Sequence, residues 1–325
     1  LMDGHRSPGH RADSRVMHPF RFGLQCKGPA DPDGWRELAR RLEGDGWSTL
    51  TVADHLDEGL APIPALMAAA DATTTLRVGS MVLANDYRHP VVVAKEAATL
   101  DVLTGGRFDL GIGAGWMTAD YETAGFAMDP AGVRVARLAE ALSVLRGLWA
   151  DGPCTFDGEH YRVTGLPGLP RPVTPGGPPI VIGGGGPRVL SLAGAQADVV
   201  GLNVNLAAGV IDERAFPDGT PASTDRKVAL VRAAAADRPV PPELQVRVHL
   251  AMVTDDRDAV IDELAPAFGL TPADAAETPH ALIGSVDQIC DQLLERRERW
   301  GISYLGLSQD QLDAFAPVVA RLGGS

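Results

Sequence analysis

Residues 77–116 read RVGSMVLANDYRHPVVVAKEAATLDVLTGGRFDLGIGAGW. Two short apolar runs, Arg77–Leu83 and Arg107–Ile112, flank Val91–Leu103, whose apolar residues recur at helical spacing. The runs are rich in β-forming residues and are apolar on both faces, which is typical of strands in a buried parallel sheet. The stretch therefore predicts a strand, a helix and a second strand.

The same alternation continues outward in both directions. The further apolar runs are Phe20–Gln25, Thr49–Ala53, Ile180–Gly183, Asp198–Leu202, Gln245–Val253 and Ser303–Leu307. Eight strand candidates separated by amphipathic segments predict a (β/α)8 TIM barrel with insertions. The rival fold, a doubly wound open sheet, would need a glycine fingerprint after its first strand, and FRFGLQCKGPADP contains none.

Two irregular segments account for the length beyond a minimal barrel. Residues 151–179 are rich in Gly and Pro and predict a hairpin with its turn at Asp157-Gly158. Residues 207–242 are rich in Ala, Asp and Pro and predict one helix near Ser223–Ala236. Neither segment is large enough for a domain, so we expect a disordered tail over residues 1–18 and a single barrel domain over residues 19–325.

Composition narrows the classes of function. The 325 residues carry a formal net charge of -13, which argues against general binding to nucleic acid or to an anionic membrane. No apolar run reaches the roughly 18 residues that a membrane helix needs. Cys26, Cys154 and Cys290 are scattered and lack metal-ligand spacing. We therefore expect a cytoplasmic protein that acts on a small molecule, with no metal site.

In a TIM barrel, the chemistry takes place at the carboxyl ends of the strands. Polar, aromatic or glycine residues follow five of the predicted strands, at Asp54-His55, Met81–Asn85, Gly113–Trp116, Gly183–Arg188 and Asn203–Asn205. We expect these residues to gather at one rim of the barrel.

The run Gly183–Gly186 lies between a predicted strand and a predicted helix that begins at Pro187. Glycine leaves backbone amides open to a ligand, and a helix N-terminus attracts anions. The loop therefore predicts a phosphate site to which Arg188 adds a positive charge. A tight turn without a ligand is an equally good explanation of the glycines.

Asp54, His55 and Trp116 are the candidate catalytic residues. Asp54 and His55 suit proton transfer or contact with a cofactor, and a capping or packing role is the alternative. A metal site would need further ligands that the other strand ends do not supply. Trp116 either stacks on a planar ligand or covers the barrel core.

Four segments carry a family resemblance when they are taken in order. They are residues 79–116, RLAEALSVLRGLW (137–149), PPIVIGGGGPRVLSLAGAQADVVGL (178–202) and IGSVDQICDQLLERRERWGISYLGL (283–307). They resemble the luciferase-like monooxygenase family and are most similar to its actinobacterial branch, which uses coenzyme F420, an 8-hydroxy-5-deazaflavin. Relatives that use FMN make FMN the alternative cofactor.

The resemblance implies a luciferase-like TIM barrel with an insertion before the fifth strand. It also implies a non-proline cis peptide at Met81-Val82 that supports the cofactor ring, with Asp54 near the polar edge of the ring. The further cofactor-binding residues expected on this basis are Met81, Val82, Ala84, Gly113, Ala114 and Gly115 around the ring, and Gly184, Gly185 and Gly186 at the phosphate. Arg188 is expected near the phosphate or the tail of the cofactor because it is one of the basic residues closest to the predicted rim.

The function implied by the resemblance is hydride transfer between C5 of F420 and a small organic substrate, with His55 near the substrate face. Because Asp54 and His55 follow the second predicted strand, we expect His55 to be the proton donor or acceptor and Asp54 to orient His55 or the ring. The alternatives are an FMN-dependent monooxygenase that uses O₂ and a non-catalytic cofactor-binding subunit. Family members are often dimers, so a homodimer is a further expectation.

The substrate is expected to differ from a sugar phosphate. The sugar-phosphate dehydrogenases of the family carry a catalytic Glu where this chain has Trp116. Asp57 and Glu58 also follow the Asp-His pair, and their charges favour an uncharged or cationic substrate.

Overall fold

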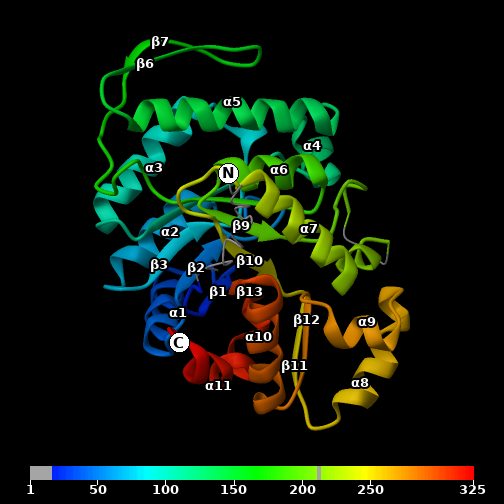
Figure 1. The fold of residues 1–325 in the computed structure, drawn as a ribbon. Helices are drawn as coiled ribbons and strands as arrows, with labels where there is room; N and C mark the ends of the chain where they lie inside the picture. Colours follow the sequence, from blue (N-terminus) through cyan, green and yellow to red (C-terminus); the bar gives the residue numbers. More distant parts are fainter. Residues whose placement is uncertain (1–16, 211–213) are drawn as a thin grey trace, which may run out of the picture.

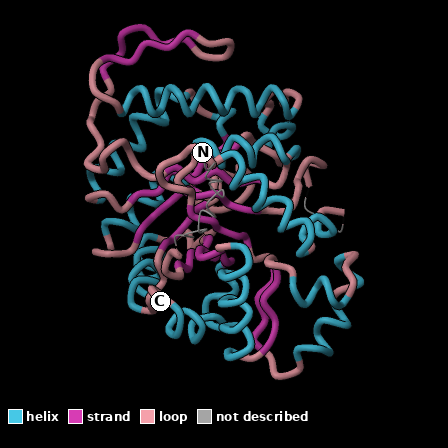
Figure 2. Tube along the Cα trace, viewed as in Figure 1, coloured by secondary structure: helices cyan, strands magenta, loops and turns pink. Residues whose placement is uncertain are grey.

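Eight of the apolar runs assemble into a closed parallel barrel in the computed structural model, which describes residues 17–210 and 214–325 (Figures 1 and 2). Around the barrel the strands follow the order β3, β2, β1, β13, β10, β9, β8, β5, and pairing of β3 with β5 closes it. The short strand β4 (Leu83–Ala84) extends the line of β3 and pairs with β5. The barrel strands are β1 (Arg21–Gln25), β2 (Thr49–Val52), β3 (Arg77–Ser80), β5 (Phe108–Gly113), β8 (Ile180–Gly184), β9 (Val199–Leu202), β10 (Glu243–Arg247) and β13 (Ile302–Ser308).

The predicted TIM barrel is confirmed, and helices cover its outside (Figures 1 and 2). In the first helix Trp35, Leu38, Ala39 and Leu42 recur at helical spacing and are buried, and the side chain of Asp31 caps the N-terminus. The sequence also offers Asp33 as a cap, but Asp33 lies within the first turn. Within the described ranges, no helix has the length and apolar character to cross a membrane. The helices are α1 (Pro32–Gly44), α2 (Pro62–Asp71), α3 (Pro90–Thr104), α4 (Thr118–Ala124), α5 (Ala131–Trp149), α6 (Pro187–Gln196), α7 (Pro221–Ala234), α8 (Arg257–Leu264), α9 (Pro272–Glu277), α10 (Val286–Trp300) and α11 (Leu312–Leu322).

The two irregular segments behave as predicted where the structure describes them. Strands β6 (Pro153–Asp157) and β7 (Arg162–Pro167) form the antiparallel hairpin, and Gly158 N–H donates to the carbonyl of Tyr161 at 2.9 Å in its turn. The hairpin extends beyond α5, away from the barrel (Figure 1). Helix α7 is the expected helix of the second segment. The predicted tail falls outside the described residues except for 17 and 18, and the single domain stays a prediction.

The predicted seventh strand, Gln245–Val253, is wrong as one element. The chain leaves the barrel after β10, and the second half of the run forms β11 (Leu250–Val253), which pairs with β12 (Ala281–Gly284). These two strands, α8 and α9 form a small unit outside the barrel with its own apolar cluster (Figure 1). Both halves of the run are apolar, the first in the barrel and the second beside the apolar cluster of the outer unit. The sequence pattern therefore did not show where the chain leaves the barrel.

The amino end of the barrel is closed by a cluster of charged side chains. Asp109 accepts hydrogen bonds from Arg21 at 3.1 Å and from Arg77 Nε at 3.1 Å. Arg21 also pairs with Glu243 at 2.8 Å, and its guanidinium lies 4.4 Å from the centre of the Tyr304 ring. The cluster thereby joins β1, β3, β5, β10 and β13, and only 5% of the Asp109 side chain is exposed.

Replacing the carboxylate in this cluster tests its contribution to stability. Asp109→Ala leaves two guanidinium groups without their shared carboxylate, so the free energy of unfolding in urea should fall by about 3 kcal/mol. The matched control is Asp157→Ala, which removes an exposed ion pair with Arg162 and should cost less than about 1 kcal/mol. Equal losses in the two variants would contradict this role.

Two histidines join the barrel to the outer unit. His280 donates from Nδ1 to the carbonyl of Arg247 at 2.8 Å, and His249 N–H donates to the carbonyl of His280 at 2.8 Å. Burial, together with the nearby positive charges of Lys227 and Arg296, lowers the pKa of His280 to about 4. Burial, His280 and Arg247 lower the pKa of His249 to about 3. Both rings are therefore neutral in the folded protein at pH 7.

Acid should destabilise the protein through these rings. The unfolded chain binds protons at about pH 6.5 and the folded chain only near pH 4 or below, so the stabilising contribution is present above pH 6.5 and is lost as the pH falls. We expect His280→Phe to flatten the decline of unfolding free energy between pH 7 and pH 5, measured by urea denaturation. The control His160→Phe, on the hairpin turn, should keep the wild-type slope, and an unchanged slope in His280→Phe would contradict the account.

Candidate functional site

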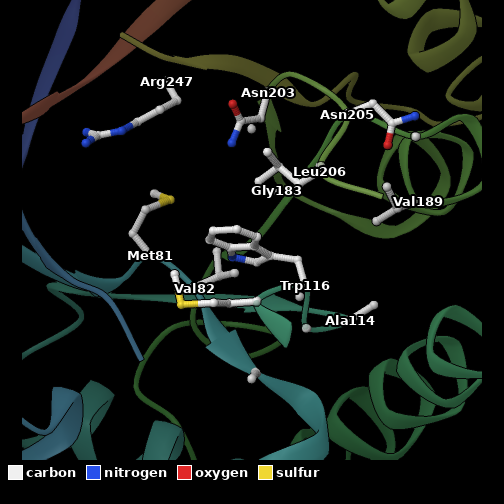
Figure 3. Close-up of a pocket in the computed structure, with 18 of the residues that line it drawn as sticks. Met81, Val82, Ala114, Trp116, Gly183, Val189, Asn203, Asn205, Leu206 and Arg247 are labelled. Atoms are coloured by element: carbon white, nitrogen blue, oxygen red, sulfur yellow. The ribbon is translucent and has the colours of Figure 1, made fainter. Parts of the chain in front are cut away.

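A cavity of about 630 Å³ lies at the carboxyl ends of the barrel strands (Figure 3). Its volume is in the range of sites for small molecules and cofactors. Every site residue predicted from the sequence lines it, namely Asp54, His55, Met81, Val82, Ala84, Gly113, Ala114, Gly115, Trp116, Gly184, Gly185, Gly186 and Arg188. The expected gathering at one rim is confirmed, whereas the individual roles stay predictions.

Other residues that line the cavity were missed. Gln25 ends β1 and Lys27 follows it, Asp120 lies on α4, and Arg247 ends β10. The true end of β10 was hidden inside an overlong predicted strand, and α4 was not predicted. A carboxylate seven residues after a strand end, such as Asp120, gives no pattern that distinguishes it from a surface residue.

The backbone between β3 and β4 forms one wall of the cavity. The Met81-Val82 peptide is cis, as the resemblance implies. The glycines of β5 make room for Val82, because a Cβ on Gly113 would lie 2.8 Å from Val82 Cγ2. Trp116 lies near Val82 in the centre of the view in Figure 3.

The glycine-rich loop leads from β8 into α6, which begins at Pro187 as predicted. Internal packing explains two of the glycines, because a Cβ would lie 2.4 Å from Val189 Cγ1 at Gly184 and 2.4 Å from the Val204 carbonyl at Gly185. At Gly186 the nearest atom would be 3.9 Å away, so that position borders open space. No side chain caps the N-terminus of α6, which leaves its first amides for a ligand.

Two arginines flank the loops. Arg188 is exposed at the start of α6, and no carboxylate of the described chain lies within the 4 Å of an ion pair. Arg134 is buried and donates to the carbonyls of Asp129 at 2.9 Å and Ala114 at 3.3 Å. It thereby fixes the loop after β5, where Gly115 has a φ of +77° and no room for a Cβ beside Tyr121.

The hydrogen-bond partners of Asp54 are Arg88 and the backbone of Ala84. Asp54 accepts two hydrogen bonds from Arg88, at 2.6 and 3.1 Å, and one from the backbone N–H of Ala84 at 3.0 Å. This bidentate pair holds the β4 backbone against the end of β2. The structure therefore shows Asp54 in contact with Arg88 and the backbone of Ala84, and it gives no hydrogen bond between Asp54 and His55 in the described part of the chain.

The carboxylate that contacts His55 belongs to Asp120. His55 Nδ1 lies 2.9 Å from Asp120 Oδ2, and Leu56 N–H donates to the other oxygen at 3.4 Å. The buried carboxylate accepts a hydrogen bond from Nδ1–H, so in the neutral ring Nε2 is left as an acceptor for a ligand. The Trp116 ring meets the His55 ring edge to face at 5.7 Å. Burial, with Asp120 nearby, raises the pKa of Tyr87, which keeps its phenol protonated.

The acidic residues after Asp54-His55 do not leave a free negative charge in the cavity. Glu58 pairs with Lys27 at 2.7 Å, and Asp57 is exposed and does not line the cavity. The physical basis for expecting an uncharged or cationic substrate is therefore removed.

Curated relatives match about half of the chain. The F420-dependent glucose-6-phosphate dehydrogenase of Nakamurella multipartita is 35% identical over 189 residues, which are 55% of each chain. The enzyme of the same name from Mycobacterium avium is 36% identical over 171 residues, or 50% of each chain. The chain thus spans about half the length of the curated relatives it matches.

Solved structures match the fold over nearly the whole chain. A coenzyme F420-dependent tetrahydromethanopterin reductase from Methanopyrus kandleri has a TM-score of 0.74 at 18% identity, covering 94% of this chain and 97% of its own. An F420-dependent secondary alcohol dehydrogenase, solved with an F420-acetone adduct, has a TM-score of 0.71 at 20% identity, covering 94% and 98%. A long-chain alkane monooxygenase has a TM-score of 0.71 at 16% identity, covering 94% and 91%.

The family model that matches the sequence extends over most of the barrel. It is described as luciferase-like monooxygenase and matches residues 13–281. Together with the closed parallel barrel and the cavity at its carboxyl end, this match assigns the sequence to a family. The chain belongs to the luciferase-like monooxygenase family.

Proposed function

We propose that the protein is an oxidoreductase that uses coenzyme F420 to transfer a hydride to or from a small organic substrate. The observation that carries the proposal is one cavity in which the backbone wall at Val82, the open loop at Gly186 and the His55-Asp120 pair all lie. The names of the curated relatives, which are F420-dependent enzymes, support this cofactor.

The residues of the cavity fit a flat ring that carries a phosphate. Met81 and Val82 offer an apolar surface to the ring, and the bound Asp54 keeps the Ala84 backbone fixed beside it. The first amides of α6 and the unpaired Arg188 suit the phosphate. When bound, F420 supplies a carbon that accepts or donates a hydride, and the protein positions the substrate against it.

His55 is the group that moves the proton that accompanies hydride transfer. Its Nε2 is the only ring nitrogen not held by Asp120, so it can accept a proton from an alcohol or return one to a carbonyl. The Asp120 carboxylate keeps the required tautomer and stabilises the ring when it becomes charged. Trp116 offers no acid or base, and it narrows the cavity beside His55. We therefore propose a substrate other than glucose 6-phosphate.

The cofactor is tested by titrating the cofactor-free protein with F420 and, separately, with FMN by fluorescence quenching. We expect F420 to bind at least tenfold more tightly than FMN. In Arg188→Gln the F420 affinity should fall about tenfold, because one charge-assisted contact to an anion is lost. The control Arg162→Gln, an exposed arginine on the hairpin, should bind as wild type.

A preference for FMN would instead indicate an oxygen-using flavin enzyme. Binding of neither cofactor would contradict the phosphate site.

The proton role is tested with a panel of alcohols and ketones, following reduction or reoxidation of F420. His55→Ala should lower turnover by about 10² to 10⁴ and leave F420 affinity within twofold of wild type. Asp120→Asn should lower turnover less and change its pH profile, because the ring loses the acceptor that fixes its tautomer. Full turnover in His55→Ala across the pH range would rule out this role.

A further inference from the structure

Arg247 is a cation in the cavity that has only neutral partners. It is the last residue of β10, and its guanidinium donates to the carbonyl of Gly306 at 3.4 Å and to the hydroxyl of Ser308. Across the described chain, no carboxylate lies within 4 Å of it, and Asp310 acts on it only from a greater distance. Burial lowers the pKa of Arg247 to about 10, so it is still charged at pH 7.

Apart from Arg188, the other charged groups that line the cavity already have hydrogen-bond partners. Its carboxylates are Asp54, Glu58 and Asp120, and these pair with Arg88, Lys27 and His55 respectively. Arg134 is held by backbone carbonyls at the loop after β5. Among the described residues, three guanidinium groups line the cavity without an anionic partner, Arg134, Arg188 and Arg247. The donors of Arg134 are taken up by three backbone carbonyls, which leaves Arg188 and Arg247 as the two that can bind an anion.

These two arginines leave the barrel at different strands, with β9 between them. Arg188 follows β8, whereas Arg247 ends β10 and reaches across β13 toward β1. The order of strands places β1 and β13 between Arg247 and His55. Figure 3 shows the same separation, with Arg247 and Met81 on one side of Trp116 and Val189 on the other. One anion that binds at the glycine-rich loop does not neutralise both.

We propose that Arg247 binds an oxyanion of the substrate, a carboxylate or a phosphate, and that the protein acts on an anionic small molecule. The proposal rests on the proposed function, since the glycine-rich loop and Arg188 are reserved there for the cofactor. A guanidinium presents parallel N–H donors that match the oxygens of either oxyanion. The interaction is stronger at a half-buried guanidinium than at one that is fully exposed to water.

The position of Arg247 relative to His55 indicates which end of the substrate Arg247 binds. His55 lies at the end of β2, two strands away from β13, along the rim toward which the Arg247 side chain points. An anion fixed at Arg247 leaves the rest of a short substrate on the His55 side of the cavity. Arg247 is thus a specificity-determining residue, and the proton chemistry remains at His55.

The test compares matched anionic and neutral probes by calorimetry on the F420-loaded protein. The pairs are hexanoate with hexanamide, benzoate with benzamide, and glucose 6-phosphate with glucose. In the wild type at least one anion should bind tenfold or more tightly than its neutral partner, and the pair identifies the oxyanion as carboxylate or phosphate. Arg247→Gln should reduce that ratio to within twofold of one, and Arg247→Lys should retain part of it.

Two controls show whether the effect is specific to Arg247 and to the substrate. Arg171→Gln, an exposed arginine outside the cavity, should keep the wild-type ratio. The F420 affinity of Arg247→Gln should stay within twofold of wild type. If F420 does not bind at all, the proposed function fails, and the same probe pairs on the cofactor-free protein still test Arg247.

Three results would overturn the proposal. One is a wild-type protein that prefers no anion over its neutral partner. Another is a preference that survives Arg247→Gln. The third is a tenfold loss of F420 affinity in Arg247→Gln with an unchanged probe ratio, which would place the guanidinium against the cofactor.

Discussion

The ion cluster around Asp109 is the constraint on which the rest of the structure depends. It joins residues from strands that are far apart in the sequence, and it fills the amino end of the barrel with matched charges. A barrel whose lower end is filled in this way can hold a ligand only at the other end. There, the strands finish in glycines, a cis peptide and unsatisfied donors rather than in bulky side chains.

The charges at the open end explain how an acidic protein can hold anionic ligands. The chain has a formal net charge of -13, yet each carboxylate of the cavity has a side-chain partner, while the three arginines that line the cavity have no carboxylate partner among the described residues. A phosphate or a carboxylate that enters the cavity is therefore exposed to a local excess of positive charge. The more distant acidic groups of the surface are screened by salt. The net charge therefore argued against nucleic acids and anionic membranes as partners. It gave no information about the charge of a small-molecule ligand.

Periodicity was sufficient to predict the barrel, because eight apolar runs alternating with helices leave few other topologies. It also placed all thirteen predicted site residues at one cavity, since parallel strands end at the same rim. It failed for Asp120 and Arg247. The pairing of Asp120 with His55 is created by the turn of α4, and the end of β10 is defined by where the chain leaves the barrel. The glycines at 184 and 185 look like ligand contacts in the sequence, yet they are needed for contacts with Val189 and Val204.

A crystal structure of the complex with F420 tests the central claim most directly, because it shows which loop holds the phosphate. The account predicts the phosphate within hydrogen-bonding distance of the amides that begin α6 and of Arg188. It also predicts the ring against Val82, with the substrate side open to His55 and Arg247. A phosphate bound at Arg247, or a ring that lies away from the Met81-Val82 wall, would contradict it.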